Sequence, residues 1–427
     1  MPLSGSAPGL QVNCDALDCA RLRARRTMKW SRYPPDVLPA WVAEMDFPLA
    51  PVVVAAIQGL LDAHDLGYPE PVGLAEAFAS WAQRHQGWHP DPALACPVGD
   101  VLAGVEAALR VFTAVGDQVV LPTPAYPPFF TLLRRLDRAV LPWPLRDEPH
   151  GWALDLQPLD EALRRGARVL LLCHPHNPTG RVFTRGELAA IAQTVHTWGA
   201  HVISDEVHAP LLATDTTFTP YAASGPHATA HSVTVTSISK GWNVPELKCA
   251  LLQAQPGTAH VIAAVPQYER LRASTPGVAA SIAAWTDDGG WLAQLRAHLD
   301  RTRAELADWV RRTPGVRAHP GQVGYLAWLD LRGTPLGADP AAVLLQRGRL
   351  AVSPGREFAL PAEQGRGWVR LHHGTSLPLL RERCGVSSAP SPAAPPGAGM
   401  PGKRATPPHR DRPDCARAHP DTLRTLP

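Results

Sequence analysis

Lys240 lies in the stretch SISKGW, directly after the alternating segment HSVTVTS. Such alternation of apolar and polar residues is typical of a β-strand, so we expect Lys240 at a strand end. A lysine there is either an ordinary surface residue or an amine held in a low-dielectric pocket to form a Schiff base. The other polar residues at strand ends decide between these two interpretations.

If Lys240 forms a Schiff base, pyridoxal 5′-phosphate is the obvious aldehyde, and its chemistry requires particular partners. Its pyridine nitrogen needs a buried carboxylate, and Asp205 ends the apolar stretch VISD. Its phenolic oxygen needs hydrogen-bond donors, for which Asn177 in HPHNPTG and His208 are candidates. Taken alone, each also has a simpler explanation, as a helix N-cap, a turn residue or a structural histidine.

The phosphate, the ring and the substrate need further contacts. Phosphate binds to backbone N–H groups at a helix N-terminus and to hydroxyl or cationic side chains. An aromatic face should cover the ring, and Tyr126 lies in the proline-rich loop PTPAYPPF. Arg370 in WVRLHHG is a candidate anchor for a substrate carboxylate. The candidates for the phosphate are Gly104, Val105, Glu106, Ser237, Ser239 and Lys248.

Short apolar runs alternate with helical stretches from about residue 95 onward, and this predicts an α/β domain with a mostly parallel sheet. Ligands of such sheets bind at the carboxyl ends of the strands, where Asn177, Asp205 and Lys240 are expected. The expected strands are 117–124, 168–173, 200–206 and 231–239, and the expected helices are 51–65, 73–85, 101–112 and 186–199.

A helix at 291–312 followed by strands at 324–331 and 367–374 suggests a second, smaller α+β unit. The end of the chain is rich in Pro, Ala, Gly and Arg and has no aromatic residue, so it cannot offset its ordering entropy by burial. The predicted parts are a loose N-terminus (1–14), an N-terminal segment of the small domain (15–46), a large cofactor domain (47–275), a small C-terminal domain (276–384) and a disordered tail (385–427).

Composition excludes several classes of protein. The 427 residues carry a net charge of +3 with both signs interspersed, which does not indicate binding to nucleic acid or to a charged membrane. We find no secretory signal and no apolar run of transmembrane length. The seven cysteines are scattered without zinc-binding spacing, which favours reduced thiols in the cytoplasm.

Several motifs together resemble a known family. NPTG, the strand ending at Asp205 and SISK resemble fold-type I pyridoxal-phosphate enzymes, the aspartate aminotransferase superfamily. The segment TMKWSRYPPDVLPAWVAEMDFPLAPVV resembles the start of the MalY/PatB group of cystathionine β-lyases. LGYPEP, PTPAYPPF, HPHNPTGRVF, SDEVHAPLL, SISKGWNVPELKCA and GYLAWLDLRG fit that group in the same order, so the resemblance covers residues 15–384.

The resemblance implies a seven-stranded large domain and a role for each residue. Lys240 would be the Schiff-base lysine and proton shuttle, Asp205 would pair with the pyridine nitrogen, and Tyr126 would stack on the ring. Asn177 would face the phenolic oxygen, and Arg370 would hold the substrate carboxylate. His208 resembles the lyase group, because aminotransferases usually have tyrosine there. Tyr68 in LGYPEP would reach the phosphate of a neighbouring subunit, which implies a homodimer with shared active sites.

Four features depart from the family pattern. Glu246 replaces a glycine in NVPELK, where it either pairs with Lys248 and weakens phosphate binding or points into solvent. His174 replaces an asparagine in HPHNP, and His372 replaces another in RLHH. The helix that usually follows this last motif stops early and gives way to the proline-rich tail.

The chemistry implied is β-elimination, in which Lys240 removes the α-proton of an amino acid and a thiolate leaves from the β-carbon. With L-cystathionine the products are homocysteine, pyruvate and ammonia, but cystine and other cysteine conjugates stay open as substrates. An aminotransferase would use the same lysine, aspartate and arginine. A cofactor-binding protein with impaired activity or a regulatory role is the third alternative, because Glu246 and the altered C-terminus could damage the site.

Overall fold

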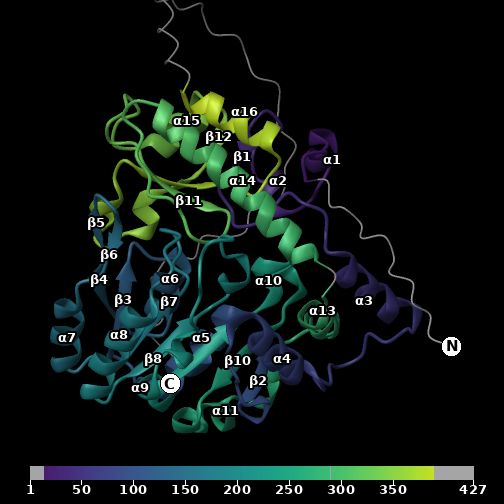
Figure 1. Cartoon of the computed structure of the whole chain (residues 1–427), viewed down its shortest axis with the longest axis vertical. Helices are drawn as coiled ribbons and strands as arrows, with labels where there is room; N and C mark the ends of the chain where they lie inside the picture. The colour runs from purple at the N-terminus through teal and green to yellow at the C-terminus, as the bar shows by residue number, and fades with distance from the viewer. Residues whose placement is uncertain (1–13, 289, 389–427) are drawn as a thin grey trace, which may run out of the picture. The chain divides into compact units, whose positions relative to one another are not determined.

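The computed structural model describes residues 14–288 and 290–388, and a seven-stranded sheet forms the core of its lower half in the view of Figure 1. The strand order is β2-β10-β9-β8-β7-β3-β4, and β10 is antiparallel to both of its neighbours while the other four pairs are parallel. The prediction of a mostly parallel sheet in an α/β fold is therefore confirmed. The strands are β2 (Ala95–Val98), β10 (Ala250–Ala254), β9 (Ser232–Thr236), β8 (His201–Asp205), β7 (Val169–Cys173), β3 (Gln118–Thr123) and β4 (Ala139–Pro144).

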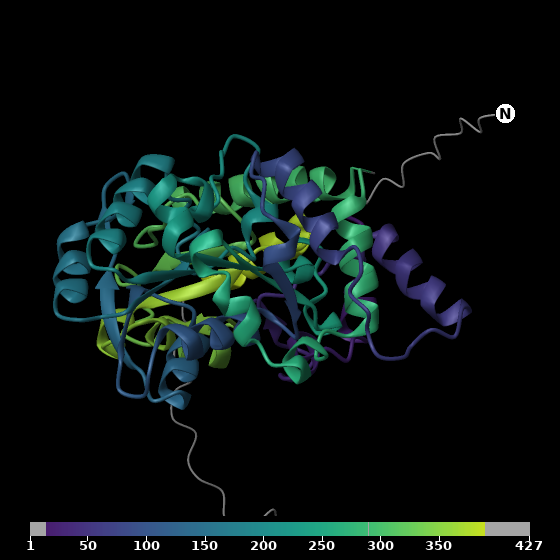
Figure 2. The ribbon, with the colours of Figure 1, turned by 90° about the horizontal axis from the view of Figure 1, so that it is seen from below.

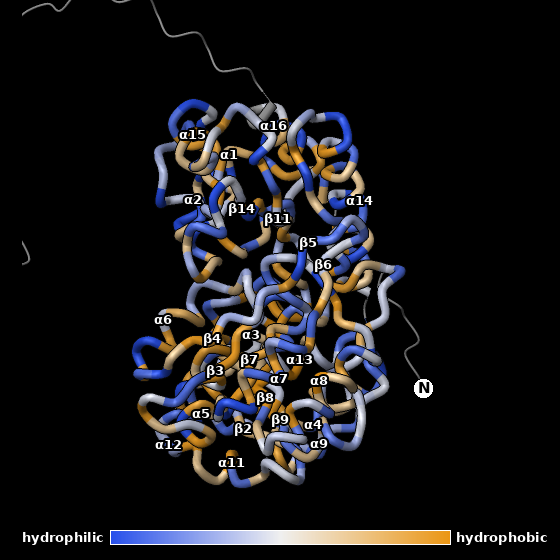
Figure 3. Tube along the Cα trace, turned by 90° about the vertical axis from the view of Figure 1, so that its left-hand side faces the viewer, coloured by the Kyte–Doolittle hydropathy of each residue, from blue (hydrophilic) through white to orange (hydrophobic). Residues whose placement is uncertain are grey.

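Helices cover both faces of this sheet, as Figure 2 shows. Alternate residues of each strand face opposite sides, so Leu171 packs with helix α5 (Val101–Phe112) while Leu170 and Leu172 pack with α7 (Leu156–Arg164) and α8 (Arg185–Thr197). All five residues of β7 are buried, which is expected for a parallel strand that is covered on both sides. The trace around β3, β7 and β8 is accordingly largely orange, the colour of hydrophobic residues, in Figure 3.

The sequence prediction located the long elements but missed short ones. Helices α3 (Pro51–Asp62), α4 (Leu74–Gln86) and α8 were all predicted. Strand β4 was not predicted, because Pro142 and Pro144 interrupt its pattern; it lies at the edge of the sheet, where proline is tolerated. The other helices around the sheet are α6 (Pro127–Arg135), α9 (Pro226–His231), α10 (Ile238–Gly241), α11 (His260–Ala264), α12 (Gln267–Arg270) and α13 (Thr275–Thr286).

The N-terminal segment joins the C-terminal third of the chain. Strand β1 (Leu38–Pro39) pairs in parallel with β12 (Leu350–Ala351), more than 300 residues later. Leu22, Trp30 and Leu38 share one hydrophobic cluster with this C-terminal part. The elements of this combined part are α1 (Cys19–Arg23), α2 (Met28–Ser31), α14 (Trp291–Arg312), β11 (Leu326–Asp330), α15 (Pro340–Gln346), β13 (Ser353–Pro354), β14 (Trp368–His372) and α16 (Leu377–Ser388). Strands β11, β14 and β13 form a three-stranded sheet in that order. The hairpin of β5 (Arg146–Glu148) and β6 (Gly151–Ala153) is a separate two-stranded sheet, and its Trp152 packs against Trp368 of β14.

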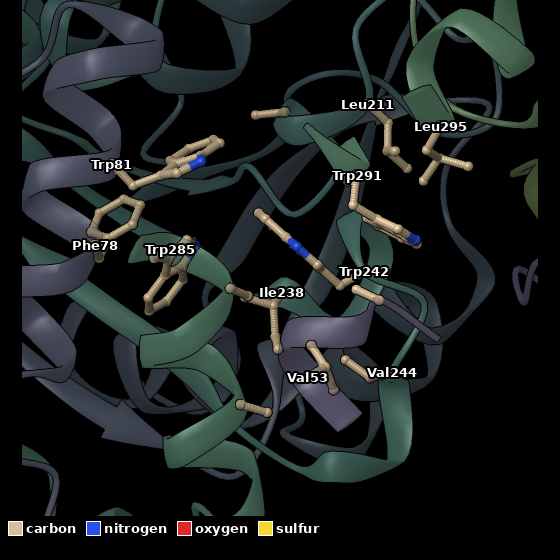
Figure 4. Packing of buried hydrophobic residues seen from close by; sticks show 14 of the residues in the cluster. Val53, Phe78, Trp81, Leu211, Ile238, Trp242, Val244, Trp285, Trp291 and Leu295 are labelled. Carbon is tan, nitrogen blue, oxygen red and sulfur yellow. The ribbon is translucent and has the colours of Figure 1, made fainter. Parts of the chain in front are cut away.

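The predicted domain boundary after residue 275 lies at the start of a helix that packs against the large part of the chain. Helix α13 begins there, and its Trp285 packs with Phe78 and Trp81 of α4 in the large part (Figure 4). The described chain clusters as one compact unit, so the proposed division stays a prediction. The predicted loose start lies outside the described residues except for Cys14, which is buried, and the predicted tail lies outside them from residue 389.

A buried ionic cluster connects the N-terminal segment to α16. Asp46 accepts hydrogen bonds from Lys29 Nζ at 2.6 Å, from Trp30 Nε1 at 2.9 Å and from Arg383 Nη2 at 3.0 Å. The side chains of Lys29, Asp46 and Arg383 are 0% exposed. His372 lies beside this cluster, 3.4 Å from Arg383 Nη1, and burial together with the nearby cations holds its pKa well below the usual value. The departure at His372 therefore places a neutral ring against a buried arginine.

Candidate active site

The carboxyl ends of three neighbouring strands meet at one edge of the sheet. Cys173 pairs with Asp205 across β7 and β8, and Asp205 pairs with Val235 across β8 and β9. A cavity of about 850 Å³ lies at this edge. Of the predicted site residues, it is lined by Tyr126, Asn177, Asp205, His208, Ser237, Ser239, Lys240 and Lys248.

Lys240 is carried by the short helix α10, which is anchored on both sides of the lysine. Ile238 and Trp242 belong to the hydrophobic cluster shown in Figure 4, and the hydroxyl of Ser237 caps the helix by accepting from Ser239 N at 3.1 Å. The Nζ of Lys240 donates to the carbonyl of Ala43 at 3.2 Å. Burial and the charge of Arg370 lower the pKa of Lys240 to about 8, against the opposing effect of Asp205. A large share of this amine is therefore neutral near pH 8.

Asp205 is the last residue of β8 and is 4% exposed. One carboxylate oxygen, Oδ1, accepts from Val207 N at 3.1 Å, which orients the group at the cavity. Burial raises the pKa of Asp205 to about 6, while the Val207 hydrogen bond and the charge of Lys240 oppose that rise. Near neutral pH the group is a buried carboxylate that would be stabilised by a cationic ligand group.

Arg370 and Asn177 form a second buried pair. Arg370 Nη1 donates to Asn177 Oδ1 at 3.2 Å, and Nη2 donates to the carbonyl of Trp41 at 3.0 Å. The guanidinium carbon lies 4.8 Å from the centre of the Phe358 ring. Burial lowers the pKa of Arg370 to about 10, so it stays cationic at neutral pH. Arg370 is not among the residues that line the cavity, but it contacts Asn177, which is.

Tyr126 and His208 supply ring surfaces to the cavity. Tyr126 precedes α6, where Pro127 begins the helix, and its ring packs edge-on against Phe129 with centroids 5.4 Å apart. Burial raises the pKa of Tyr126. Burial, together with the charges of Lys240 and Arg370, lowers the pKa of His208 to about 3, so this imidazole is neutral at physiological pH.

The residues of helix α5 that lie at the cavity are not the ones predicted to bind the phosphate. Asp100 caps α5 by accepting from Ala103 N at 2.9 Å, and Val101 and Leu102 are the helix residues that line the cavity. The second turn contains the three residues predicted to bind phosphate, and they are not among the lining residues: Gly104, Val105 and Glu106.

That prediction was therefore misplaced along the chain, for a packing reason. A β-carbon on Gly104 would lie 2.8 Å from Val235 Cγ1, so the glycine allows α5 to approach the sheet. Val105 is fully buried on that same side. Glu106 forms ion pairs with Arg110 and Arg135 on the outside of the helix.

Lys248 lies near the start of α5, but two carboxylates are close to it. Its Nζ is 3.4 Å from Asp100 Oδ2 and 3.6 Å from Glu246 Oε1. The Glu246 side chain is 85% exposed, so it points toward solvent while it pairs with Lys248, and the weakening of phosphate binding stays a prediction. Ser237 Oγ donates to the carbonyl of Cys249 at 2.7 Å, which leaves Ser239 as the less engaged hydroxyl of the two.

Tyr68 and His174 lie away from the cavity of this chain. Tyr68 is 92% exposed in the loop after α3, and the cavity-lining residues do not include it. His174 is buried between the rings of Phe183 and Phe218, with centroid distances of 5.5 and 4.7 Å. Burial lowers the pKa of His174 to about 4, so this departure from the family pattern adds a neutral packing residue.

Sequence patterns did not identify the contacts that hold the N-terminal segment over Lys240. Asn243 accepts from Met45 N at 2.7 Å and donates to Met45 O at 2.9 Å. The Tyr325 hydroxyl donates to the carbonyl of Ala43 at 3.0 Å, the same carbonyl that accepts from Lys240. The local sequence signal for these contacts was the asparagine at position 243. In the structure Asn243 has a positive φ of 59°, a conformation that asparagine tolerates better than most residues.

Comparison with known proteins identifies the class of enzyme to which this fold and the cavity at the strand ends belong. Residues 42–384 match the family described as aminotransferase class I and II, and the chain belongs to that family. A Mycobacterium leprae protein provisionally named a cystathionine beta-lyase is 37% identical over 86% of this chain and 95% of its own length. Cystathionine beta-lyase PatB of Bacillus subtilis is 29% identical over 81% of this chain and 90% of its own.

A solved structure agrees with these relatives. A Corynebacterium diphtheriae protein, provisionally assigned as a PLP-dependent β-cystathionase, superimposes with a TM-score of 0.82 at 34% identity, covering 87% of this chain and 97% of that one. The predicted resemblance to fold-type I enzymes and to the MalY/PatB group is therefore confirmed. Within the described residues, no helix is both long and apolar enough to span a membrane.

Proposed function

We propose that the protein is a pyridoxal 5′-phosphate-dependent carbon–sulfur lyase. It cleaves L-cystathionine, or a related cysteine S-conjugate, to a thiol, pyruvate and ammonia. The observation that carries the proposal is the Lys240 amine, which lies in the same cavity as the buried Asp205 carboxylate and has a pKa of about 8. The names of the relatives, cystathionine beta-lyases, support the same activity.

The residues at the cavity fit this cofactor. Asp205 is buried with one oxygen already hydrogen-bonded, so the carboxylate suits a protonated pyridine nitrogen. Asn177 is held by Arg370 with its amide at the cavity, where it suits the phenolic oxygen. The Tyr126 ring suits the face of the cofactor. The N-terminus of α5, Ser239 and Lys248 would hold the phosphate.

The bound cofactor supplies an electron sink that stabilises negative charge at the α-carbon of the substrate. Lys240 removes the α-proton, and its pKa of about 8 gives the amine a larger neutral share near physiological pH than an ordinary lysine has. Arg370 binds the α-carboxylate and so orients the bond to be broken. His208 lines the same cavity as Asp205 and stays neutral, so it does not compete with the pyridine nitrogen for the charge of that carboxylate.

The elimination conserves atoms and charge without an external oxidant. The C–S bond breaks with both electrons going to sulfur, so the thiolate leaves and takes up a proton. The three-carbon product, 2-aminoacrylate, is released and hydrolyses to pyruvate and ammonia. An aminotransferase would instead return a proton to the cofactor and would need a 2-oxo acid as the second substrate.

We further propose that the enzyme is a cytoplasmic homodimer in which Tyr68 reaches the phosphate bound by the partner subunit. The 92% exposure of Tyr68 supports this, since an aromatic ring on a surface loop gains most by being covered. The cysteines are scattered along the sequence, which supports reduced thiols and therefore the cytoplasm as the location of the enzyme. Tyr68→Ala should weaken cofactor binding without changing the melting temperature of the apo-protein.

The deciding experiment is pyruvate release from L-cystathionine by purified protein with added pyridoxal phosphate and no 2-oxo acid. Pyruvate and free thiol in equal amounts are the expected result. Amino-group transfer only after a 2-oxo acid is added would make the protein an aminotransferase. Neither activity, together with weak cofactor retention, would indicate an impaired or regulatory protein.

A further inference from the structure

Two side chains of opposite charge line the cavity that holds Lys240. They are Glu44 and Arg25, both from the N-terminal segment that covers this part of the site. Glu44 directly follows Ala43, whose carbonyl is 3.2 Å from Lys240 Nζ, and its charge raises the pKa of Lys240. The two groups therefore belong to the same space as the reacting amine.

Hydrogen bonds orient both groups but do not neutralise them. Glu44 Oε1 accepts from the hydroxyl of Thr27 at 2.8 Å, and Arg25 Nη2 donates to the carbonyl of Asp46 at 2.9 Å. Across residues 14–288 and 290–388, neither Glu44 nor Arg25 has an ion-pair partner. Hydroxyls and carbonyls carry no net charge, so Glu44 and Arg25 add one anion and one cation without ion-pair partners to the groups already described in the cavity.

A ligand with its own ammonium and carboxylate groups would complement this pair. We propose that Glu44 binds the ammonium and Arg25 the carboxylate of the amino acid that leaves as a thiol. This inference rests on the proposed lyase function and specifies its substrate class: thioethers and disulfides with an α-amino acid at both ends, such as cystathionine and cystine. S-alkyl cysteines lack the second amino acid and are poorer substrates.

The rest of the cavity is consistent with a two-ended substrate. Met28, Phe47 and Leu49 line it together with the charged pair, and they offer apolar contacts to the methylene groups between the two ends. Its volume of about 850 Å³ is near the top of the range of about 300–1,000 Å³ for small-molecule sites, so it has room for the cofactor and a substrate together.

The test compares substrates that differ by one charged group. They are L-cystathionine, S-(3-carboxypropyl)-L-cysteine without the distal ammonium, and S-(3-aminopropyl)-L-cysteine without the distal carboxylate. In the wild-type enzyme, removing either group lowers kcat/KM about tenfold, because a charge-assisted hydrogen bond is lost. In Glu44→Gln the preference for cystathionine over the carboxypropyl compound disappears, and in Arg25→Gln the preference over the aminopropyl compound disappears.

Glu363→Gln is the matched control, because it removes an exposed carboxylate that does not line the cavity. With saturating cofactor it leaves these substrate ratios as in the wild type. Arg25 also holds the Asp46 carbonyl, so Arg25→Lys is tested beside it, and Glu44→Gln decides alone if both arginine variants misfold.

Three results overturn the inference. Equal kcat/KM for all three substrates in the wild-type enzyme shows that the distal charges are not recognised. Ratios unchanged by Glu44→Gln show that this carboxylate is not the binding group. If no cysteine conjugate, including S-ethyl-L-cysteine, yields pyruvate, the lyase function itself fails; turnover of S-ethyl-L-cysteine with no preference for cystathionine refutes only the inference.

Discussion

Two buried lysines of this chain have the same lowered pKa but different surroundings. Burial lowers the pKa of both Lys29 and Lys240 to about 8. Lys29 Nζ lies 2.6 Å from Asp46 and 2.7 Å from the carbonyl of Glu44, with its side chain completely enclosed. Lys240 Nζ has a single carbonyl contact at 3.2 Å and lines a large cavity.

The comparison shows that a low pKa alone does not indicate a reactive amine. Desolvation shifts both groups in the same direction, but only Lys29 has its donors committed to a carboxylate. Lys29 is therefore structural: with Arg383 it balances Asp46 and connects the first helices to α16. Lys240 has no ion-pair partner among the described residues, so its nitrogen is available for bond formation and proton transfer.

Removing Lys240 should have the largest effect on activity. We expect Lys240→Ala to reduce pyruvate formation by about 10⁴-fold or more, because both the cofactor attachment and the base are lost. Stability should change by only about 1 kcal/mol, since the amine makes one backbone hydrogen bond. Pyruvate release and the melting temperature measure the two effects; turnover near the wild-type rate would contradict the role of Lys240.

The opposite pattern is expected at the Lys29 cluster. Asp46→Asn would leave Lys29 and Arg383 buried together without a counter-charge, so we expect a loss of about 3–5 kcal/mol in the free energy of unfolding. Lys29→Met keeps the Arg383–Asp46 pair at 3.0 Å and should cost less. Denaturant titration of both variants measures the difference; equal stability of Asp46→Asn and the wild type would show that the cluster contributes nothing.

The pH dependence of labelling should also separate the two lysines. Only the neutral amine reacts with an aldehyde, so covalent capture of pyridoxal phosphate by the apo-protein should increase as pH rises through about 8, rather than near the usual 10.5. Borohydride trapping and peptide mass spectrometry at each pH give the site. Lys240 should be labelled along this curve, and Lys29, with the same pKa but no access, should stay unlabelled while the protein is folded. Equal labelling of both would contradict the comparison.

The sequence predicted the parts of the site that lie at strand ends. Asp205 and Lys240 follow apolar runs, and parallel pairing brings such ends to one edge, so their placement required no distant contacts. The phosphate prediction was misplaced because Gly104 was interpreted as the start of the helix, where backbone N–H groups would bind the phosphate. Asp100, before the same apolar run, was the better signal for the helix start, since aspartate is a strong N-cap.

The rest of the site depends on residues that are far apart in the chain. The carbonyl of Ala43 reaches Lys240 from 197 residues away, and Arg370 reaches Asn177 across 193 residues. Glu44 and Arg25 are brought to the cavity by the same long-range packing of the N-terminal segment. Backbone carbonyls carry no sequence signature, and single charged residues such as Glu44 and Arg25 are common, so neither was assigned from the sequence. Arg370 and Asn177 were predicted as site residues, but their contact with each other was not.

A third lysine, Lys248, extends the comparison to an exposed side chain, and a substitution beside it should have the smallest effect. Its side chain is 45% exposed and forms ion pairs with both Asp100 and Glu246. It is therefore neither enclosed like Lys29 nor without an ion-pair partner like Lys240. Glu246→Gln removes one competing charge from a solvent-exposed pair, which is worth up to about 1 kcal/mol, so pyridoxal phosphate should bind at most about fivefold more tightly.

Salt identifies the cause of that change. Screening weakens the attraction of exposed charges, so the gain in Glu246→Gln should be largest at low ionic strength and should fade at about 1 M salt, where the Debye length is about 3 Å. Fluorescence titration of the apo-protein with pyridoxal phosphate gives the dissociation constant at each salt concentration. Glu363→Gln, an exposed carboxylate outside the cavity lining, is the control. If Glu246→Gln and Glu363→Gln bind the cofactor equally at low salt, Glu246 does not draw Lys248 away from the phosphate, and this departure from the family pattern has no cost for the site.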